Sequence, residues 1–410
     1  MEFNEFLKKA NEGYKLIPII KEIESFDREA IDIYSNHFDE KKSFFFESLE
    51  GDKNWSRYTI IGCSSGDFIE IYGNEIHRFS NFFCEEKIKH SNPIEWLEES
   101  FNEFKAFIPG NLPSFSGGFV GHFSFESVCF FEDTIKRKEQ TNDINAPDIS
   151  LIICKDFIVF DKTHNKVFIV VFSDNSKKGY DDSNEKVSNY EKLLVTDLHP
   201  NDHAKEAQKT TVKYDFERQD FISAVKKIKK YISSGDVMQV VLSQRMMIDF
   251  PEKPINFYRE LRQINPSPYM YYLNMGDYTV VGSSPEILVR LEDKKVTVRP
   301  IAGTRPRGDS KESDNNYEIE LLRDNKELAE HLMLIDLGRN DIGRICETGS
   351  IKLTDQMIIE RYSHVMHMVS NVEGYIKPGS SFFDVLRATF PAGTVSGAPK
   401  IRALQIIFEL

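Results

Sequence analysis

The stretch KELAEHLMLIDLGRND, residues 326–341, has the periodicity of an amphipathic helix, and the rest of the chain is organised around it. Leu328, Leu332 and Ile335 recur at i, i+4 and i+7, the spacing of one apolar stripe. We therefore predict a helix that packs on a core through this stripe.

Two carboxylates lie on a neighbouring face of the same predicted helix. Glu327 and Glu330 are three residues apart and can approach a common point, and His331 and Leu334 share their face. Mg²⁺ suits that point, because it takes one or two protein carboxylates and completes its shell with substrate and water. A solvated helix surface shows the same spacing, so the flanking sequence must separate the two interpretations.

The composition is that of a globular protein, with 40% hydrophobic and 29% charged residues among 410, a length that predicts two or three domains. A net charge of −13 argues against nucleic acid or an anionic membrane surface as the main partner. The cysteines are scattered and odd in number, which disfavours a disulfide framework or a zinc site. The N-terminal stretch has no apolar signal core and no run approaches a membrane span, so we expect a cytoplasmic protein.

Hydrophobic patterning divides the chain into three predicted segments, 1–172, a linker over 173–213, and 214–410. The first predicts antiparallel strands with a few helices, one of them opened by Pro93. The second is polar and turn-rich, with one short amphipathic helix predicted near 190–194.

The last segment mixes helices and strands. Helices are predicted over 220–233 and 381–388. Strands are predicted over 237–250, over 269–281, over 286–299 with a hairpin turn at 292–295, and over 351–375 with a turn near 361–363. Within 237–250, period two puts Gln239, Ser243 and Arg245 on one face with Val237 and Val241, which predicts a face lining solvent or a polar pocket.

Two glycine-rich stretches are candidate anion cradles, because free backbone N–H groups and a helix N-terminus favour negative charge. PAGTVSGAPK, residues 391–400, leads into a predicted helix, and PIAGTRPRG, residues 300–308, follows a predicted strand. A structural loop is an equal interpretation of the first. Arg305 and Arg307 in the second form either an anion clamp or a solvated turn. A G-x-C-x-G elbow is missing, which disfavours acyl transfer by a cysteine nucleophile.

Nine stretches, in this order, carry a resemblance to a known family. They are FFFESLEG (44–51), GGFVGHFSFE (117–126), GDVMQVVLSQR (235–245), NPSPYMYYL (265–273), GSSPEILVR (282–290), RPIAGTRPRG (299–308), ELAEHLMLIDLGRNDIGR (327–344), RYSHVMHMVSNVEG (361–374) and TFPAGTVSGAPKIRA (389–403). The chain resembles the chorismate-utilising enzymes, and among them the anthranilate synthase component I family. This implies an α+β fold in which antiparallel β-sheets pack face to face with helices outside.

Two positions separate the reactions within the wider family. Related isochorismate and salicylate synthases carry a water-activating Lys where this chain has Gln239, and an amide cannot act as a base. Aminodeoxychorismate synthases carry a nucleophilic Lys in a PIKGT motif, where this chain has Ala302. The resemblance therefore implies that ammonia adds directly to C2 of chorismate.

The resemblance also implies roles for individual residues. Glu330 would bind Mg²⁺, with Glu327 steadying the ion through water. Glu286 would protonate the departing C4 hydroxyl, and His367 would assist pyruvate elimination and aromatisation. The residues expected to contact substrate carboxylates are Gly303, Thr304 and Thr394.

Regulation and partners follow from the same resemblance. Feedback inhibition by L-tryptophan is implied, with an effector pocket formed by Ser48, Pro268, Tyr269 and Met270, whose alternative role is ordinary packing. Ammonia would come from a separate glutamine amidotransferase subunit, giving a hetero-oligomer with 1–172 as regulatory or partner-binding region and 214–410 as chorismate-binding catalytic domain.

One departure from the family is expected. The family continues beyond the position of Leu410 with strands that supply a second metal-binding Glu and further chorismate contacts, so an incomplete catalytic domain lacking its C-terminal strands is predicted. The alternatives are an aminodeoxychorismate synthase component I, which Ala302 disfavours, and a non-catalytic tryptophan-binding regulatory chain.

Overall fold

The structure is a computed structural model that describes residues 1–410 except 41, 50–56, 64, 111, 114, 136–143 and 199–209. The fold has two compact units, and the chain passes between them several times. Unit 1 comprises Met1–Ser127, Asn142–Lys205 and Glu252–Ser284, and unit 2 comprises Val128–Thr141, Glu206–Pro251 and Pro285–Leu410. This division differs from the predicted segments, because 252–284 belongs to unit 1.

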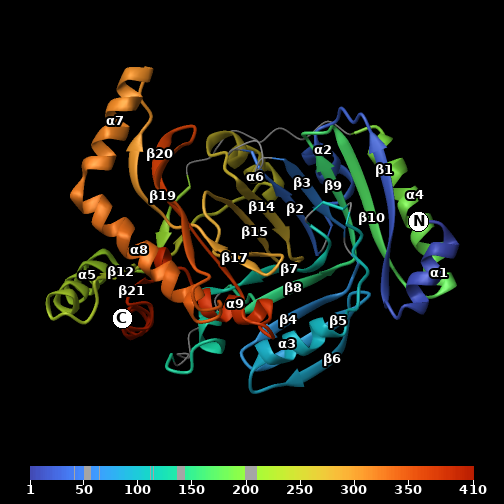
Figure 1. The fold of residues 1–410 in the computed structure, drawn as a ribbon, viewed down its shortest axis with the longest axis horizontal. Coiled ribbons are helices and arrows are strands. Elements are labelled where there is room, and N and C mark those ends of the chain that lie inside the picture. The colour runs from blue at the N-terminus through green and yellow to red at the C-terminus, as the bar shows by residue number, and fades with distance from the viewer. Residues whose placement is uncertain are drawn as a thin grey trace. The chain divides into compact units, whose positions relative to one another are not determined.

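A seven-stranded antiparallel sheet runs through unit 1 (Figure 1). Its order is β1 (Leu16–Glu24), β10 (Lys166–Asp174), β9 (Asp156–Asp161), β3 (Tyr58–Gly62), β2 (Ser43–Glu47), β14 (Tyr269–Asn274) and β15 (Thr279–Ser284). The inner strand β2, SFFFE, carries phenylalanines on both faces because the sheet is covered on both sides. Of the matched stretch FFFESLEG, Glu50 and Gly51 lie outside the described residues.

A second antiparallel sheet in unit 1 packs on one face of the first. Its order is β6 (Phe83–Lys89), β5 (Glu75–Ser80), β4 (Phe68–Tyr72), β8 (Ile149–Cys154) and β7 (Gly118–Phe123). A shared core joins Phe44 and Phe157 of the first sheet to Val120 and Ile152 of the second. The predicted face-to-face packing of antiparallel sheets is therefore confirmed.

Helices cover the other face of the seven-stranded sheet. They are α1 (Phe3–Asn11), α2 (Ala30–His37), α4 (Lys177–Val195) and α6 (Pro254–Ile264). Helix α3 (Pro93–Asn102) and the 3-10 helix η1 (Phe125–Phe130) are not part of this group. Phe6, Tyr34, Leu194 and Tyr258 anchor the four helices in one core. The short helix predicted near 190–194 lies within α4, but the predicted linker 173–213 is wrong over the rest of that helix. Buried Val187 and Leu194 hold its 19 residues against the sheet, although many of them are charged.

Unit 2 is built on a sheet whose central strand is β20 (Val365–Tyr375). Its neighbours are β19 (Lys352–Arg361) on one side and β17 (Lys295–Val298) and β18 (Ile301–Pro306) on the other, with β16 (Arg290–Glu292) beside β17. The predicted hairpin at 292–295 is confirmed, with Asp293 and Lys294 at φ 47° and 66°. The predicted strand–turn–strand over 351–375 is also confirmed.

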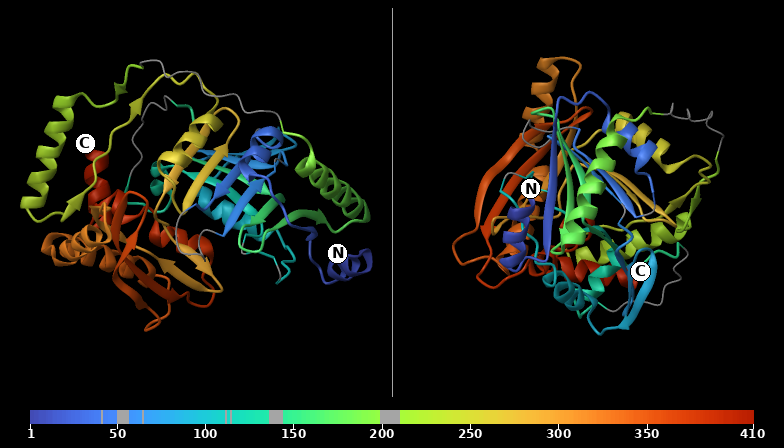
Figure 2. Two further views of the ribbon diagram at one scale, coloured as in Figure 1. Left: turned by 90° about the horizontal axis from the view of Figure 1, so that it is seen from above. Right: turned by 90° about the vertical axis from the view of Figure 1, so that its right-hand side faces the viewer.

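Helices α7 (Lys311–Arg323) and α8 (Asn325–Gly343) lie against this sheet (Figure 1). Near the C-terminus follow α9 (Phe382–Thr389), η2 (Gly393–Val395), β21 (Gly397–Ala398) and α10 (Lys400–Glu409). Helix α10, red in Figure 2, packs beside α5 (Arg218–Ser233) through Ile228 and Ile406.

Three local predictions in unit 2 need correction. The predicted strand 237–250 forms only two short pairings among the described residues, β12 (Gln239–Val240) with β21 and β13 (Met246–Met247) with β11 (Lys213–Tyr214), because no neighbouring strand lies along the rest. The predicted loop 300–308 is mostly strand β18, bulged between Ala302 and Thr304. Leu332, predicted to be buried, is 48% exposed, because α8 faces the core with His331, Leu334 and Ile335 instead.

Among the described residues, no helix is both long enough and apolar enough to cross a membrane.

Candidate active site

The site is arranged around helix α8, whose start is defined by an N-cap. Asp324 accepts hydrogen bonds from the backbone N–H of Lys326 at 3.0 Å and of Glu327 at 3.4 Å. Arg305 of β18 holds the same carboxylate at 2.9 Å and approaches Glu327 to 3.8 Å. The cap and the arginine together fix Glu327 on the turn that faces β18.

A bulge in β18 brings the glycine-rich stretch against Glu327. Gly303 has φ +65°, and a Cβ added there would lie 3.4 Å from Glu327 Oε2 and 2.9 Å from Leu321. Only glycine tolerates this backbone conformation together with the close approach of the two side chains. Gly303 and Glu327, both predicted site residues, are therefore direct neighbours.

Strand β20 places His367 beside the same bulge. His367 Nδ1 lies 3.2 Å from the carbonyl oxygen of Gly303 and 3.1 Å from Thr304 Oγ1. The carbonyl can only accept, so Nδ1 carries the proton and Nε2 keeps its lone pair. Burial lowers the pKa of His367, which keeps the ring neutral at neutral pH.

The second carboxylate of α8 meets the short strand β12. Gln239 Nε2 lies 3.5 Å from Glu330 Oε1. Gln239 pairs with Ala398 of β21, and a Cβ added to Gly397, at φ +138°, would lie 2.2 Å from the Gln239 carbonyl oxygen. Residue 397 must be glycine for this pairing, so the glycine-rich loop positions Gln239 against Glu330.

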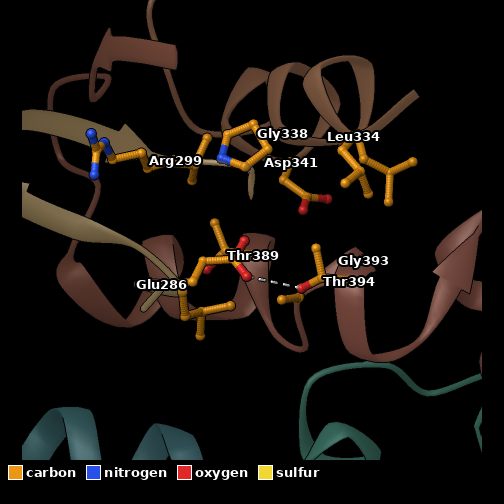
Figure 3. A pocket seen from close by; sticks show the side chains of 13 residues that line it. Glu286, Arg299, Leu334, Gly338, Asp341, Thr389, Gly393 and Thr394 are labelled. Atoms are coloured by element: carbon orange, nitrogen blue, oxygen red, sulfur yellow. Dashed lines mark hydrogen bonds between the residues drawn. The ribbon is translucent and has the colours of Figure 1, made fainter. Parts of the chain in front are cut away.

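Glu286 lies in a separate pocket along α8. Its Oε2 lies 3.5 Å from Thr394 Oγ1, and the two side chains point toward one another in Figure 3. The lining residues come from the strand ends around β17, from α8, from the end of α9 and from the glycine-rich loop: Glu286, Leu288, Val298, Arg299, Pro300, Leu334, Leu337, Gly338, Asp341, Thr389, Ala392, Gly393 and Thr394. Burial raises the pKa of Glu286 to about 7, opposed by hydrogen bonds from the Ile301 backbone and Thr394.

An ion pair that was not predicted as part of the site closes the same pocket. Lys400 Nζ lies 2.7 Å from Asp341 Oδ2 and donates to the Thr389 carbonyl oxygen at 2.9 Å. Both groups are largely buried, which raises the pKa of Asp341 and lowers that of Lys400. The sequence could have pointed to this pair, because both residues lie inside stretches that match the family and Asp341 is the last residue of the predicted helix.

Helix α8 connects these pieces. Glu327 and Glu330 lie on consecutive turns, and Leu334, which lines the Glu286 pocket, follows four residues later, about 6 Å along the axis. The structure thus gathers Glu327 with Gly303, Thr304 and His367, places Glu330 with Gln239, and places Glu286 with Thr394. The described residues show no direct contact between Glu286 and either helix carboxylate.

Arg305 and Arg307, which were predicted to form an anion clamp or a solvated turn, both form ion pairs with acidic side chains. Arg305 contacts Glu320 at 2.8 Å in addition to Asp324. Arg307 contacts Asp314 at 2.8 Å and donates to the Tyr362 carbonyl oxygen. Both guanidinium groups are thus engaged by the protein's own carboxylates.

The residues predicted to bind an effector lie together in unit 1. Met270 of β14 pairs with Glu47 of β2. The chain after Glu47 stays close to the residues before Pro268, because the Leu49 N–H donates to the Ser267 carbonyl oxygen at 3.1 Å. Ser48 lies between these two contacts. Ser48 Oγ is buried and has no hydrogen-bond partner among the described residues. Tyr269 begins β14.

The donor set around Glu330 fits a hard cation only in part. Within the described part of the chain, no group of three or more His, Cys, Asp or Glu residues could hold a metal ion. Glu327 and Glu330 nevertheless supply two oxygen ligands one helical turn apart, and the described residues place no cation in an ion pair with Glu330. Mg²⁺ commonly binds to one or two carboxylates when substrate completes its shell.

The chain belongs to a family of chorismate-binding enzymes, since the family model for a chorismate binding enzyme matches residues 44–410. The relatives it matches include anthranilate synthase component 1 of Pseudomonas putida, which is 43% identical over 417 residues covering 100% of this chain and 84% of the relative. The corresponding protein of Neisseria meningitidis is 41% identical over 413 residues, covering 99% of this chain and 83% of the relative.

Solved structures show the same fold. Anthranilate synthase component I from Streptococcus pneumoniae superposes with a TM-score of 0.75 at 33% identity, covering 88% of this chain and 78% of that one. The isochorismate synthase MenF from Escherichia coli gives a TM-score of 0.67 at 13% identity, covering 99% of this chain and 83% of that chain, a likeness of fold alone. The α+β fold and the family predicted from the sequence are confirmed.

Proposed function

We propose that this chain is the chorismate-binding subunit of an anthranilate synthase, which converts chorismate and ammonia to anthranilate and pyruvate. The observation that carries the proposal is the position of Gln239, 3.5 Å from Glu330. An amide at this point can hold a neutral nucleophile by hydrogen bonding, but it cannot deprotonate water. Ammonia needs no such base, so direct amination suits the residue present.

Glu286 has the properties of a general acid. With a pKa of about 7, a large fraction of the carboxyl is protonated at neutral pH and can donate to the departing C4 hydroxyl. The Thr394 hydroxyl at 3.5 Å orients the carboxyl toward the pocket. Proton donation converts a poor hydroxide leaving group into water.

His367 is suited to proton removal during aromatisation. Its Nδ1–H is held by Gly303 and Thr304, which orients the ring and leaves Nε2 as the basic atom. A neutral imidazole can accept the C2 proton while pyruvate leaves. Gly303 and Thr304 would in addition contact a substrate carboxylate through groups at the bulge of β18.

Glu330, with Glu327 one turn away, would hold Mg²⁺. The ion would supply positive charge that binds the ring carboxylate of chorismate and stabilises charge developing on it. Arg305, 3.8 Å from Glu327, keeps the Glu327 carboxylate turned toward β18. The chain's own contribution is therefore to orient two carboxylates on the helix face.

The proposal includes partners and regulation. A glutamine amidotransferase subunit would supply ammonia in a hetero-oligomer, and L-tryptophan would inhibit by binding at Ser48, Pro268, Tyr269 and Met270. The unpartnered Ser48 hydroxyl supports a polar ligand at that place. We propose the cytoplasm as location, supported by five free cysteines, of which three are buried.

The test is product formation by the purified chain with chorismate, ammonium and Mg²⁺, followed by the fluorescence of anthranilate and by chromatography. We expect anthranilate that disappears when a chelator removes the metal. Formation of aminodeoxychorismate instead would establish the related synthase. If calorimetry detects tryptophan binding but no binding of chorismate with Mg²⁺, the chain is a regulatory protein and the proposal fails.

A further inference from the structure

A completely buried histidine lies inside helix α8, next to Glu330 and one turn after Glu327. His331 is 0% exposed, and its Nε2 lies 2.7 Å from Ser370 Oγ of β20. Its Nδ1 is buried without a hydrogen-bond partner among the described residues. An apolar side chain of similar volume would fill the same space with no unpaired nitrogen, so packing alone does not account for a histidine here.

Ser370 joins three neighbouring elements. It is also 0% exposed, and its hydroxyl oxygen accepts the backbone N–H of Met357 at 2.9 Å. Met357 has φ +52° and lies where the β19–β20 register shifts. The Ser370 backbone N–H donates to the Pro300 carbonyl oxygen at 3.2 Å, directly before β18.

Ser370 therefore connects the bulge of β19 and the buried side of α8 through its hydroxyl, and the start of β18 through its backbone N–H. With one lone pair taken by Met357, the Ser370 hydroxyl can donate to an unprotonated Nε2 or accept from a protonated one. Either arrangement gives one directional bond between helix and sheet. The apolar contacts of Leu334 and Ile335 are not directional, so this hydrogen bond adds a constraint on the helix rotation that they lack.

The rotation and height of α8 decide where its carboxylates lie. Neighbouring residues on an α-helix differ by 100° in direction and by about 1.5 Å along the axis. A small slide or turn of α8 would break the 3.5 Å contact of Glu330 with Gln239 and move Glu327 from Gly303. His331 is adjacent to Glu330, so its bond acts at the point where precision matters.

We propose that the His331–Ser370 hydrogen bond is a positioning link, which holds α8 in register on the β18–β20 sheet and thereby aims Glu327 and Glu330 at a common ligand. This deepens the proposed function and rests on it for the identity of that ligand. Neither residue touches substrate or cation. The link acts by holding the carboxylate oxygens of Glu327 and Glu330 in place. Without it, the same oxygens would be present but wrongly positioned.

The test compares His331→Leu and Ser370→Ala, which remove the bond, with His331→Gln, whose amide can reach the serine hydroxyl. Leu332→Ala, on the same helix with an exposed side chain, is the matched control. Calorimetry with Mg²⁺ and chorismate measures binding without turnover, and steady-state assays give the half-saturating Mg²⁺ concentration and kcat. Thermal unfolding verifies that each variant is folded.

We expect His331→Leu and Ser370→Ala each to weaken Mg²⁺ binding and lower kcat about 10- to 100-fold, the usual effect of losing a partner behind a ligand. His331→Gln should stay within about threefold of the wild type, and Leu332→Ala should match it. The double variant His331→Leu/Ser370→Ala should be no worse than Ser370→Ala alone, because Ser370→Ala already removes the bond to His331 together with the acceptor of the Met357 N–H.

Wild-type Mg²⁺ affinity and kcat in folded Ser370→Ala would overturn the link, as would losses that multiply in the double variant. If His331→Leu does not fold, Ser370→Ala and His331→Gln still decide the question. A wild-type chain that binds Mg²⁺ and chorismate but yields no anthranilate refutes the proposed function alone, since the binding comparison among variants remains decisive for the link.

Discussion

The ammonium group of Lys400 lies 2.7 Å from the carboxylate of Asp341, so the first residue of α10 is bound to the end of α8. The same ammonium group donates to the Thr389 carbonyl oxygen at 2.9 Å, at the end of α9. The ammonium group thus joins α8, α9 and α10, and α9 and α10 flank the glycine-rich loop that carries Thr394. The loop can present Thr394 to Glu286 because both of its ends are held.

The buried ion pair predicts a large asymmetry between single and double variants. Asp341→Asn leaves the Lys400 charge without its counter-ion, and we expect a loss of about 3–5 kcal/mol in the free energy of unfolding. Asp341→Leu/Lys400→Met removes both charges and should recover most of that loss. Urea unfolding measures both, and equal losses in single and double variants would contradict the expectation.

The raised pKa of Glu286 predicts a pH dependence of activity. The acid must be protonated, so kcat/KM should fall as pH rises through about 7, and Glu286→Gln should lose about 10²- to 10⁴-fold of activity and that descending limb. A pH–rate profile from pH 5 to 9 measures this. An activity that stays level across pH 7 would exclude Glu286 as the acid.

The same shift predicts a change in stability. The folded-state pKa of about 7 exceeds the ordinary value of 4.5, so the folded protein binds more protons between these values and loses stability as pH rises through that window. Glu286→Gln lacks this penalty. We expect the difference in unfolding free energy to shift in favour of the variant by about 2–3 kcal/mol between pH 4.5 and pH 8, measured by denaturant titration at each pH.

The contact of Gln239 with Glu330 predicts the effect of a cation at that place. Gln239→Lys would form an ion pair with Glu330 and compete with Mg²⁺, so we expect the half-saturating Mg²⁺ concentration to rise at least about tenfold and amination to fall. Met238→Gln, at an exposed neighbouring position, is the control. Unchanged metal dependence in Gln239→Lys would remove Glu330 from the metal site.

The close approach of Gly397 to Gln239 predicts a difference between two glycine variants. Gly397→Ala would place a Cβ 2.2 Å from the Gln239 carbonyl oxygen, whereas Gly379→Ala, also at positive φ, meets no atom within 4 Å. We expect Gly379→Ala to cost about 1–2 kcal/mol of stability and to keep its activity. Gly397→Ala should cost more and lose amination, as thermal unfolding and product assays would reveal.

The proposed effector pocket predicts a separation of inhibition from catalysis. Ser48→Leu fills the space around a buried hydroxyl, so we expect the tryptophan concentration for half inhibition to rise at least about tenfold with little change in uninhibited kcat. Ser124→Ala, which removes another buried and unpartnered hydroxyl of unit 1, should leave inhibition intact. Loss of both activities in Ser48→Leu would contradict a purely regulatory role.

Much of the local structure was predictable from the spacing of apolar residues and from the residues that cap helices and form turns. The helix over 327–341, the hairpin at 292–295 and the helix after Ser381 follow from contacts within a few residues, namely caps, apolar spacing and turn residues. The candidate site residues in distant stretches could also be identified from the sequence, because they lie in the motifs that match the family. Their distances to one another could not.

Errors arose where distant parts of the chain decide. Residues 177–195 read as a linker because charge dominates them, but Val187 and Leu194 suffice to bury one face on a sheet that already exists. The alternation of side chains with a period of two predicted a strand over 237–250. A strand needs a partner along its length, and among the described residues only Gln239–Val240 and Met246–Met247 have one. The contact of Gln239 with Glu330, the proximity of Gly303 to Glu327 and the burial of His331 all join segments at least 20 residues apart in sequence. Backbone propensity acts over one or two turns, whereas burial and close approach depend on the packed surface that those segments meet.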